Sequence, residues 1–132
     1  FVGVLGFAVL FDTPPAIALT AATLGTIANV GRLAMVDAGT TAPLAAAIAA
    51  LAVGFGAFLV GDRLRAARVT ITVPAVLIMV PGAAAYRAIT GVIAGDTLSA
   101  IQNGFTAVFV VVALAIGLTV SRVLTEREWS RP

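Results

Sequence analysis

Long apolar runs, separated by short groups of charged and turn-forming residues, dominate the chain. A helix needs about 20 mostly apolar residues to cross the hydrocarbon core of a bilayer, and most of these runs reach that length. Barrel strands would alternate polar and apolar residues, and these runs do not. The pattern predicts an all-α, polytopic membrane protein, a bundle of about five transmembrane helices over 1–11, 14–35, 43–60, 69–94 and 98–121.

The segments between the helices carry the signals of turns and helix starts. Asp12 followed by Pro14 and Pro15 predicts an N-cap with proline in the first turn of the second helix. Asp96 or Thr97 is expected to cap the last helix in the same way. The remaining connections are a turn at 37–41, a charged loop at 62–68, a tight turn at 95–97 and a polar tail at 122–132.

The first helix is too short to span a membrane, because the chain begins at Phe1, already inside an apolar run. We interpret this helix as truncated. Residues 1–132 then form a single membrane domain that is a fragment or a half of a larger protein.

The fourth helix is predicted to be broken at membrane depth. Pro74, Pro81 and Gly82 interrupt an otherwise apolar run. Pro81 has no N–H group, and its ring clashes with the carbonyl of Leu77. Helices broken in this way occur in membranes where the irregular backbone lines a cavity or a substrate path.

The arginines predict the orientation of the helices. The loop at 62–68 carries three arginines and the tail at 122–132 carries three more, whereas the turns at 37–41 and 95–97 carry none. If the fourth helix crosses the membrane as a kinked span, both Arg-rich segments lie on one side, which the positive-inside rule makes cytoplasmic. A re-entrant fourth helix would place them on opposite sides, so the kinked span is preferred.

Composition narrows the classes of function. Hydrophobic residues make up 61% of the chain and charged residues only 11%, against about a quarter in soluble domains. The chain has no cysteine and no histidine, so no thiolate or imidazole metal site is expected, and no cofactor is predicted. The arginines form no continuous basic face, which argues against nucleic-acid binding. An enzyme is also disfavoured, because no nucleophile–base pair or paired carboxylates are present.

Arg87 is the leading candidate for binding a ligand. It follows the break at Pro81 and Gly82 by about one turn, and it is adjacent to Tyr86. The turn at 95–97 is about 10 Å further along the helix, which is far for the side chain to reach toward water. A guanidinium binds a carboxylate through two parallel N–H bonds, and a restarting helix adds backbone N–H groups, so the pattern favours a small carboxylate ligand.

Arg32 and Asn29 form a second candidate site. They are three residues apart, so they share one helix face. Asn103 is a further polar candidate within the last predicted span. Polar residues in spans more often join helices to one another, and that interpretation stays open for Asn29 and Asn103.

No Asp, Glu or His lies inside a predicted span, since the aspartates are all at turns. Proton-coupled carriers usually use such a group inside the membrane. Any coupling residue is therefore expected on another segment or subunit.

The broken helix resembles a known family. The residues Val73-Pro74, Val80-Pro81-Gly82 and Tyr86-Arg87-Ala88 resemble the signature of the threonine/serine exporter family, in its C-terminal membrane domain. The order of parts agrees over nearly the whole chain, from a short helix ending in FDTPP, through a helix with Gly25 and Arg32, to a last helix beginning near Asn103.

The resemblance implies secondary-active export driven by the proton motive force, in a multi-pass protein of the plasma or inner membrane. Threonine and serine are the expected substrates, and a two-subunit branch of the family exports succinate. The resemblance also implies a partner, the N-terminal half of the exporter, in the same chain or as a separate subunit. Association with further copies of the chain is compatible with this arrangement. The alternative is a non-transporting scaffold or assembly subunit of the membrane, whose polar groups only hold helices together.

Overall fold

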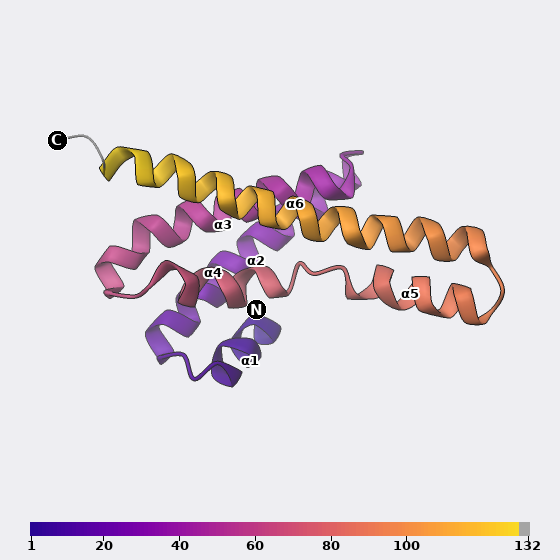
Figure 1. The fold of residues 1–132 in the computed structure, drawn as a ribbon. Helices are drawn as coiled ribbons and strands as arrows, with labels where there is room; N and C mark the ends of the chain where they lie inside the picture. The colour runs from indigo at the N-terminus through magenta and orange to yellow at the C-terminus, as the bar shows by residue number, and fades with distance from the viewer. Residues whose placement is uncertain (130–132) are drawn as a thin grey trace.

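The fold is that of a computed structural model, which describes residues 1–129 and the side chains of residues 1–126. The described part is all-helical. The helices are α1 Val2–Leu10, α2 Pro15–Asp37, α3 Ala42–Leu64, α4 Arg68–Leu77, α5 Gly82–Ile93 and α6 Thr97–Trp129 (Figure 1). The all-α, polytopic membrane class predicted from the sequence is confirmed.

Three helices, α2, α3 and α6, are long and apolar enough to cross a membrane, and α4 with α5 provides a fourth span if the bent pair is counted as one. The axes of α4 and α5 differ by 45° across the break. The predicted interruption of the fourth helix is therefore confirmed, and α1 is as short as the sequence suggests.

Two helix ends differ from the prediction. Helix α3 continues to Leu64 rather than ending at residue 60, and α6 continues to Trp129 rather than ending at 121. Much of the expected polar loop and tail is thus helical, while residues 130–132 of that tail lie outside the described residues. The reason is that arginine and glutamate favour helix, and Arg122 with Glu126 forms an i, i+4 ion pair of 2.7 Å on α6.

The predicted cap at Asp12 is wrong, whereas the one at Asp96 is confirmed. Helix α2 is capped by Pro14 without a side-chain hydrogen bond, and Asp12 has a positive φ of 52° in the turn before it. The two prolines force extended backbone between Asp12 and the helix, which carries the carboxylate away from the first N–H groups. At α6, the Asp96 carboxylate accepts a 3.1 Å hydrogen bond from the Ser99 N–H.

Small residues bring the helices into close contact. Helices α3 and α6 run in the same direction and form the most extensive helix pair. At Gly117 the backbone of α6 lies against Ala47 and Ala50 of α3. The buried core between the helices consists mainly of alanine with a few larger side chains, among them Val53, Met79 and Leu114.

Helix α5 packs against the first half of α6 in an antiparallel hairpin. A Cβ on Gly91 would lie 2.9 Å from the backbone nitrogen of Ala100, so only glycine allows this approach. The hairpin projects beyond the other helices (Figure 1). Most large apolar side chains on it are exposed, including Ile93 and Phe105.

The connections divide between two ends of the molecule. The α3–α4 connection and the C-terminal turns of α6 lie at one end, and the α2–α3 and α5–α6 turns lie toward the other (Figure 1). The α3–α4 connection and the described C-terminal turns of α6 therefore share an end, which is the arrangement expected for a kinked full span.

Candidate functional site

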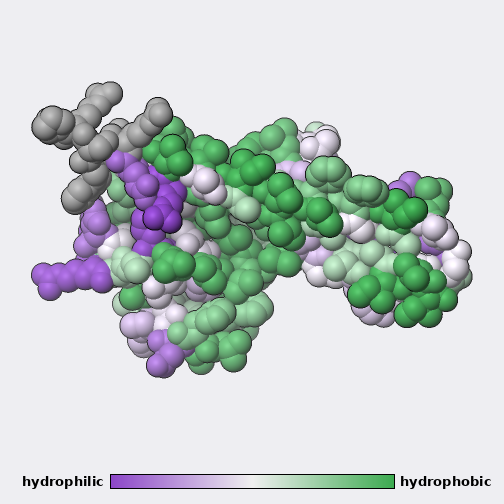
Figure 2. Space-filling view, in the orientation of Figure 1, coloured by the Kyte–Doolittle hydropathy of each residue, from purple (hydrophilic) through white to green (hydrophobic). Residues whose placement is uncertain are grey.

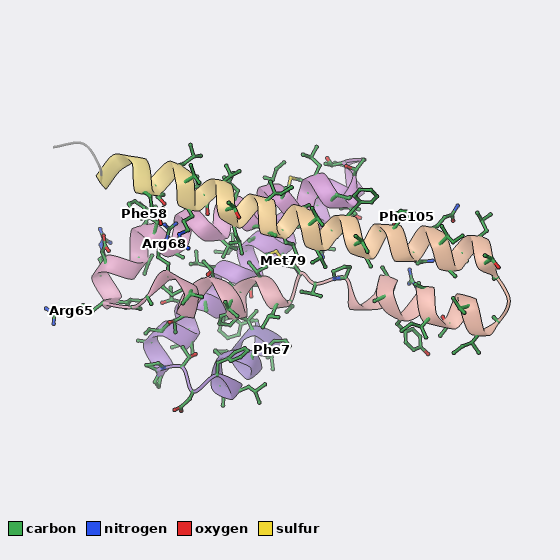
Figure 3. The ribbon with its side chains drawn as sticks, viewed as in Figure 1. Phe7, Phe58, Arg65, Arg68, Met79 and Phe105 are labelled. Atoms are coloured by element: carbon green, nitrogen blue, oxygen red, sulfur yellow. The ribbon has the colours of Figure 1, made fainter. Side chains whose placement is uncertain are left out.

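The break between α4 and α5 is anchored by a buried side chain. Met79 is 1% exposed and packs in the core, while Val80 next to it is exposed. The chain turns through two hydrogen bonds, from Met79 N–H to the Val76 carbonyl at 2.8 Å and from Gly82 N–H to the Val80 carbonyl at 2.8 Å. Figure 3 shows Met79 directed into the bundle at this point.

The sequence-predicted break residues do not act equally. Pro81 is the residue before α5, with φ −79° and ψ 61°, and Gly82 is the first residue of the helix. Pro74 lies inside α4, where it is buried and the helix continues for three further residues, so the break is not at Pro74. A single missing N–H is tolerated there, whereas the proline at 81 and the glycine at 82 act together.

Arg87 and Tyr86 lie on an exposed face of α5. Tyr86 is 68% exposed, and Arg87 is exposed beside it. Neither contributes to a hydrogen bond through its side chain among the described residues. The hydroxyl of Thr90 lies 3.2 Å from the backbone carbonyl oxygens of both residues and donates to them. This is a contact within α5 and does not involve their side chains. These two side chains therefore point away from the rest of the described chain.

Arg32 and Asn29 are brought together, as the sequence predicts. The Nε of Arg32 donates a 3.0 Å hydrogen bond to the Asn29 side-chain oxygen. Both are on α2, close to its end at Asp37 and distant in the chain from the α4–α5 break. Asn103 bonds within its own helix, because its amide donates to the Ser99 carbonyl at 2.8 Å. The structure thus joins one predicted pair and leaves Arg87 and Asn103 apart from it.

A polar cluster at the other end of α4 was not anticipated from the sequence. Arg68, at the first position of α4, donates to the Thr125 hydroxyl of α6 at 2.6 Å and to the Gly54 carbonyl of α3 at 3.0 Å. Its guanidinium carbon also lies 5.2 Å from the centre of the Phe58 ring. Figure 3 shows Arg68 turned inward beside Phe58, whereas Arg65 points away from the molecule.

Gly54 makes this cluster possible. A Cβ at Gly54 would overlap the buried hydroxyl of Ser121 on α6, so the two helices meet there through the glycine backbone. Ser121 is 1% exposed and Thr125 is 3% exposed, and both hydroxyls donate to carbonyls of α6. The sequence signal was an i, i+4 pair of hydroxyls facing a glycine, which is common in helix packing and is not specific by itself.

A cavity of about 510 Å³ opens beside the cluster. Its polar lining comes from α4 and α6, with Arg68, Thr72, Ser121, Arg122 and Glu126 on its walls. This volume is within the range of sites for small molecules. Figure 2 shows the largest group of strongly hydrophilic residues at this end, with smaller ones at the tip of the α5–α6 hairpin and at the bottom of the view.

A smaller cavity of about 230 Å³ lies between the α1–α2 turn and α4. The Thr13 hydroxyl on its wall is buried and has no hydrogen-bond partner among the described residues. No group of three or more His, Cys, Asp or Glu side chains in the described part of the chain is placed to hold a metal ion.

Comparison with known proteins gives one family match. The model of a family described as Threonine/Serine exporter, ThrE, matches residues 1–124, which is nearly the whole chain. No solved structure matches it.

Proposed function

The chain belongs to the threonine/serine exporter family, and on that premise we propose that it is one half of a two-part secondary exporter. Its substrates are small carboxylate-bearing metabolites, with threonine and serine first. Export is driven by the proton motive force across the plasma or inner membrane. The family is one of transporters, which supports a function in transport.

The observation that carries this proposal is the broken span. The N–H groups of Ala83 and Ala84, in the first turn of α5, have no backbone acceptor among the described residues, because the break removes the preceding turn. In a bilayer such groups need a partner, and a polar path beside the break supplies one. The positive end of the α5 dipole and the nearby Arg87 both favour an anionic group.

The unpaired surface of the α5–α6 hairpin supports a two-part assembly. Helix α5 makes extensive contacts with α6 alone. The side chains of Tyr86 and Arg87 face outward. The N-terminal half of the exporter, packed on this face, would enclose the break and these side chains. It would also supply a protonatable group at membrane depth, because the acidic residues of α2, α3 and α6 lie only near the ends of these helices. Further copies of the chain are a second possible neighbour.

The two alternatives predict different transport. A subunit for succinate export would accept a dicarboxylate in preference to threonine. A scaffold subunit would move neither, and the geometry of the broken helix would matter only for assembly of the membrane complex. The positive-inside rule supports a cytoplasmic position for the end of the fold that holds the α3–α4 connection and the C-terminal turns of α6.

Sealed vesicles containing the complete exporter test the proposal. Labelled threonine, serine and succinate are each offered under an imposed pH gradient, with vesicles carrying residues 1–132 alone as the comparison. We expect gradient-dependent movement of threonine and serine by the complete exporter and none by this half alone. Preferential movement of succinate would favour the dicarboxylate alternative, and no movement of any of the three would favour the scaffold.

A further inference from the structure

The cavity of about 510 Å³ at the α3–α4–α6 end contains both signs of charge on its walls. Arg68 and Arg122 are cationic and Glu126 is anionic. The break and Arg87 belong to the opposite part of the α4–α5 span, so this cavity is a separate feature of the fold (Figure 1).

Arg68 is held in place before any ligand arrives. Its bonds to Thr125 and to the Gly54 carbonyl occupy two of the five guanidinium N–H groups, and the Phe58 ring supports the guanidinium plane. Such fixed donors bind a carboxylate with little loss of side-chain entropy. Arg68 therefore combines a structural link between helices with a wall of the cavity.

The second cation, Arg122, is paired with Glu126, and a charged ligand can replace either partner of this pair. Arg122 and Glu126 pair at 2.7 Å, with side chains that are 74% and 60% exposed. Exposed ion pairs stabilise a protein very little, so the pair opens easily when a charged ligand enters. An incoming carboxylate can take the Arg122 side, and an incoming ammonium group can take the Glu126 side.

A hydroxyl group completes the lining. Thr72 of α4 is half-buried on the cavity wall, and its hydroxyl donates to the Val69 carbonyl of its own helix, whereas the Ser121 hydroxyl is buried between α3 and α6. The Thr72 oxygen remains able to accept a hydrogen bond, which suits a ligand that carries an O–H donor. The walls thus match a carboxylate, an ammonium group and a hydroxyl within one small volume.

We propose that this cavity binds a zwitterionic hydroxy-amino acid on the Arg-rich side of the membrane, as the loading site for export. The carboxylate is bound by Arg68 and Arg122, the ammonium group by Glu126, and the side-chain hydroxyl by Thr72. Glu126 repels a second carboxylate, so the cavity selects an amino acid over a dicarboxylate. This inference rests on the proposed function and names the ligand class at one end of the transport path.

Transport by the complete exporter tests the proposed binding of the substrate carboxylate by Arg68. Arg68→Lys keeps the charge but loses the planar pair of donors, so the threonine concentration for half-maximal export should rise about tenfold or more. Arg65→Lys is the matched control, because Arg65 lies in the adjacent α3–α4 connection, is not on the cavity wall and points away from the molecule. Equal values for both variants and the wild type would overturn the proposal.

Glu126→Gln tests the proposed binding of the ammonium group by Glu126 and leaves the bonds of Arg68 to α3 and α6 unchanged. The substitution should weaken the binding of threonine more than that of 2,3-dihydroxybutyrate. The latter has the carboxylate and the hydroxyls but no ammonium group. An equal effect on both compounds would overturn the role of Glu126. This variant also decides the matter if Arg68→Lys fails to assemble, since Glu126 is exposed and bonds to Arg122 alone among the described side chains.

A labelling assay separates binding from transport. The chain has no cysteine, so Thr72→Cys can be introduced into a cysteine-free exporter and labelled with a small thiol reagent. Saturating L-threonine should slow labelling at Thr72→Cys at least severalfold and leave Thr40→Cys, near the opposite end, unchanged. Protection without export would support the cavity while the proposed function failed. Absence of protection, or protection by phosphatidylglycerol vesicles but not by threonine, would overturn the proposal.

Discussion

The guanidinium of Arg68 donates a 2.6 Å hydrogen bond to the hydroxyl of Thr125, 57 residues later in the chain. This bond joins the start of α4 to the C-terminal part of α6, and the bond from Arg68 to the Gly54 carbonyl adds α3. The three helices are thus fixed to one another at the end where the Arg-rich segments lie. The hairpin of α5 and the first half of α6 lies away from this end. There α5 makes extensive contacts with α6 alone, so the Arg68 bonds do not fix it to the other helices.

Removing the Thr125 hydroxyl should loosen this end of the fold. Thr125→Val keeps the shape of the side chain and deletes a bond to a charged donor. The expected loss is about 1.5 kcal/mol of stability, at the low end for such bonds because Arg68 is only partly buried. The measurement is the unfolding midpoint in detergent. Thr119→Val is the control, because the Thr119 hydroxyl bonds only to Ala115 of its own helix; equal midpoints for the two variants would contradict the link.

The contact between α3 and α6 predicts a strong dependence on Gly117. Gly117→Ala would place a methyl group against the Ala47 carbonyl and 2.9 Å from the Ala50 Cβ. Because backbone cannot yield as a flexible side chain does, we expect a loss of about 1–3 kcal/mol from overpacking. Gly31→Ala is the matched control, since no atom lies within 4 Å of its new Cβ. Thermal unfolding of both variants compares them, and similar stability would show that the helices separate at little cost.

Much of this fold could be predicted from residue patterns because the bilayer restricts the choices. Long apolar runs must be helices there, and Pro81 with Gly82 can only interrupt one. The helix ends were harder, because Asp62 and Arg122 mark the edge of the apolar run but do not stop the helix. Hydropathy reports where lipid ends, whereas hydrogen bonding and i, i+4 pairs decide where a helix ends.

The candidate sites divide in a similar way. The Asn29–Arg32 pair could be predicted, because residues three apart on a helix always meet. The Arg68–Thr125 pair could not, because it depends on which helices pack together and in which direction. Arg68 was counted only as a charge that indicates orientation. Its role as a fixed donor emerges once Gly54 and Ser121 bring α3 against α6.

The end-to-end arrangement predicts the sidedness of the chain. Arg65, in the α3–α4 connection, and Asp37, the last residue of α2, are exposed at opposite ends of the molecule and can each be replaced by a single cysteine. With an impermeant thiol reagent, Arg65→Cys should label from the cytoplasmic side and Asp37→Cys from the outside, following the arginines. Labelling of both positions from one side would contradict the arrangement, and reversed sides would contradict only the orientation.

Straightening the broken span should abolish transport. Replacing Pro81 and Gly82 together by alanine restores the missing N–H and favours a continuous helix, and the space around Gly82 is open to a methyl group. We therefore expect normal insertion with loss of export. Pro74→Ala is the control, because α4 is already continuous through Pro74. Full activity in the double variant, measured by uptake into inverted vesicles, would exclude a role for the break.

Arg87 provides the sharpest test of the side chains beside the break. It is exposed on α5, on the hairpin surface where we propose that the partner half of the exporter packs. If it contacts a substrate carboxylate there, Arg87→Lys should raise the half-saturating threonine concentration about tenfold to a hundredfold, because lysine lacks the paired donors. Arg87→Ala should do at least as much harm while the protein still inserts, since it removes a charge that is costly in lipid. If Arg87 instead only reaches toward the membrane surface, lysine serves equally well and the wild-type value is kept. That second result would leave Arg32 with Asn29 as the better candidate within the spans.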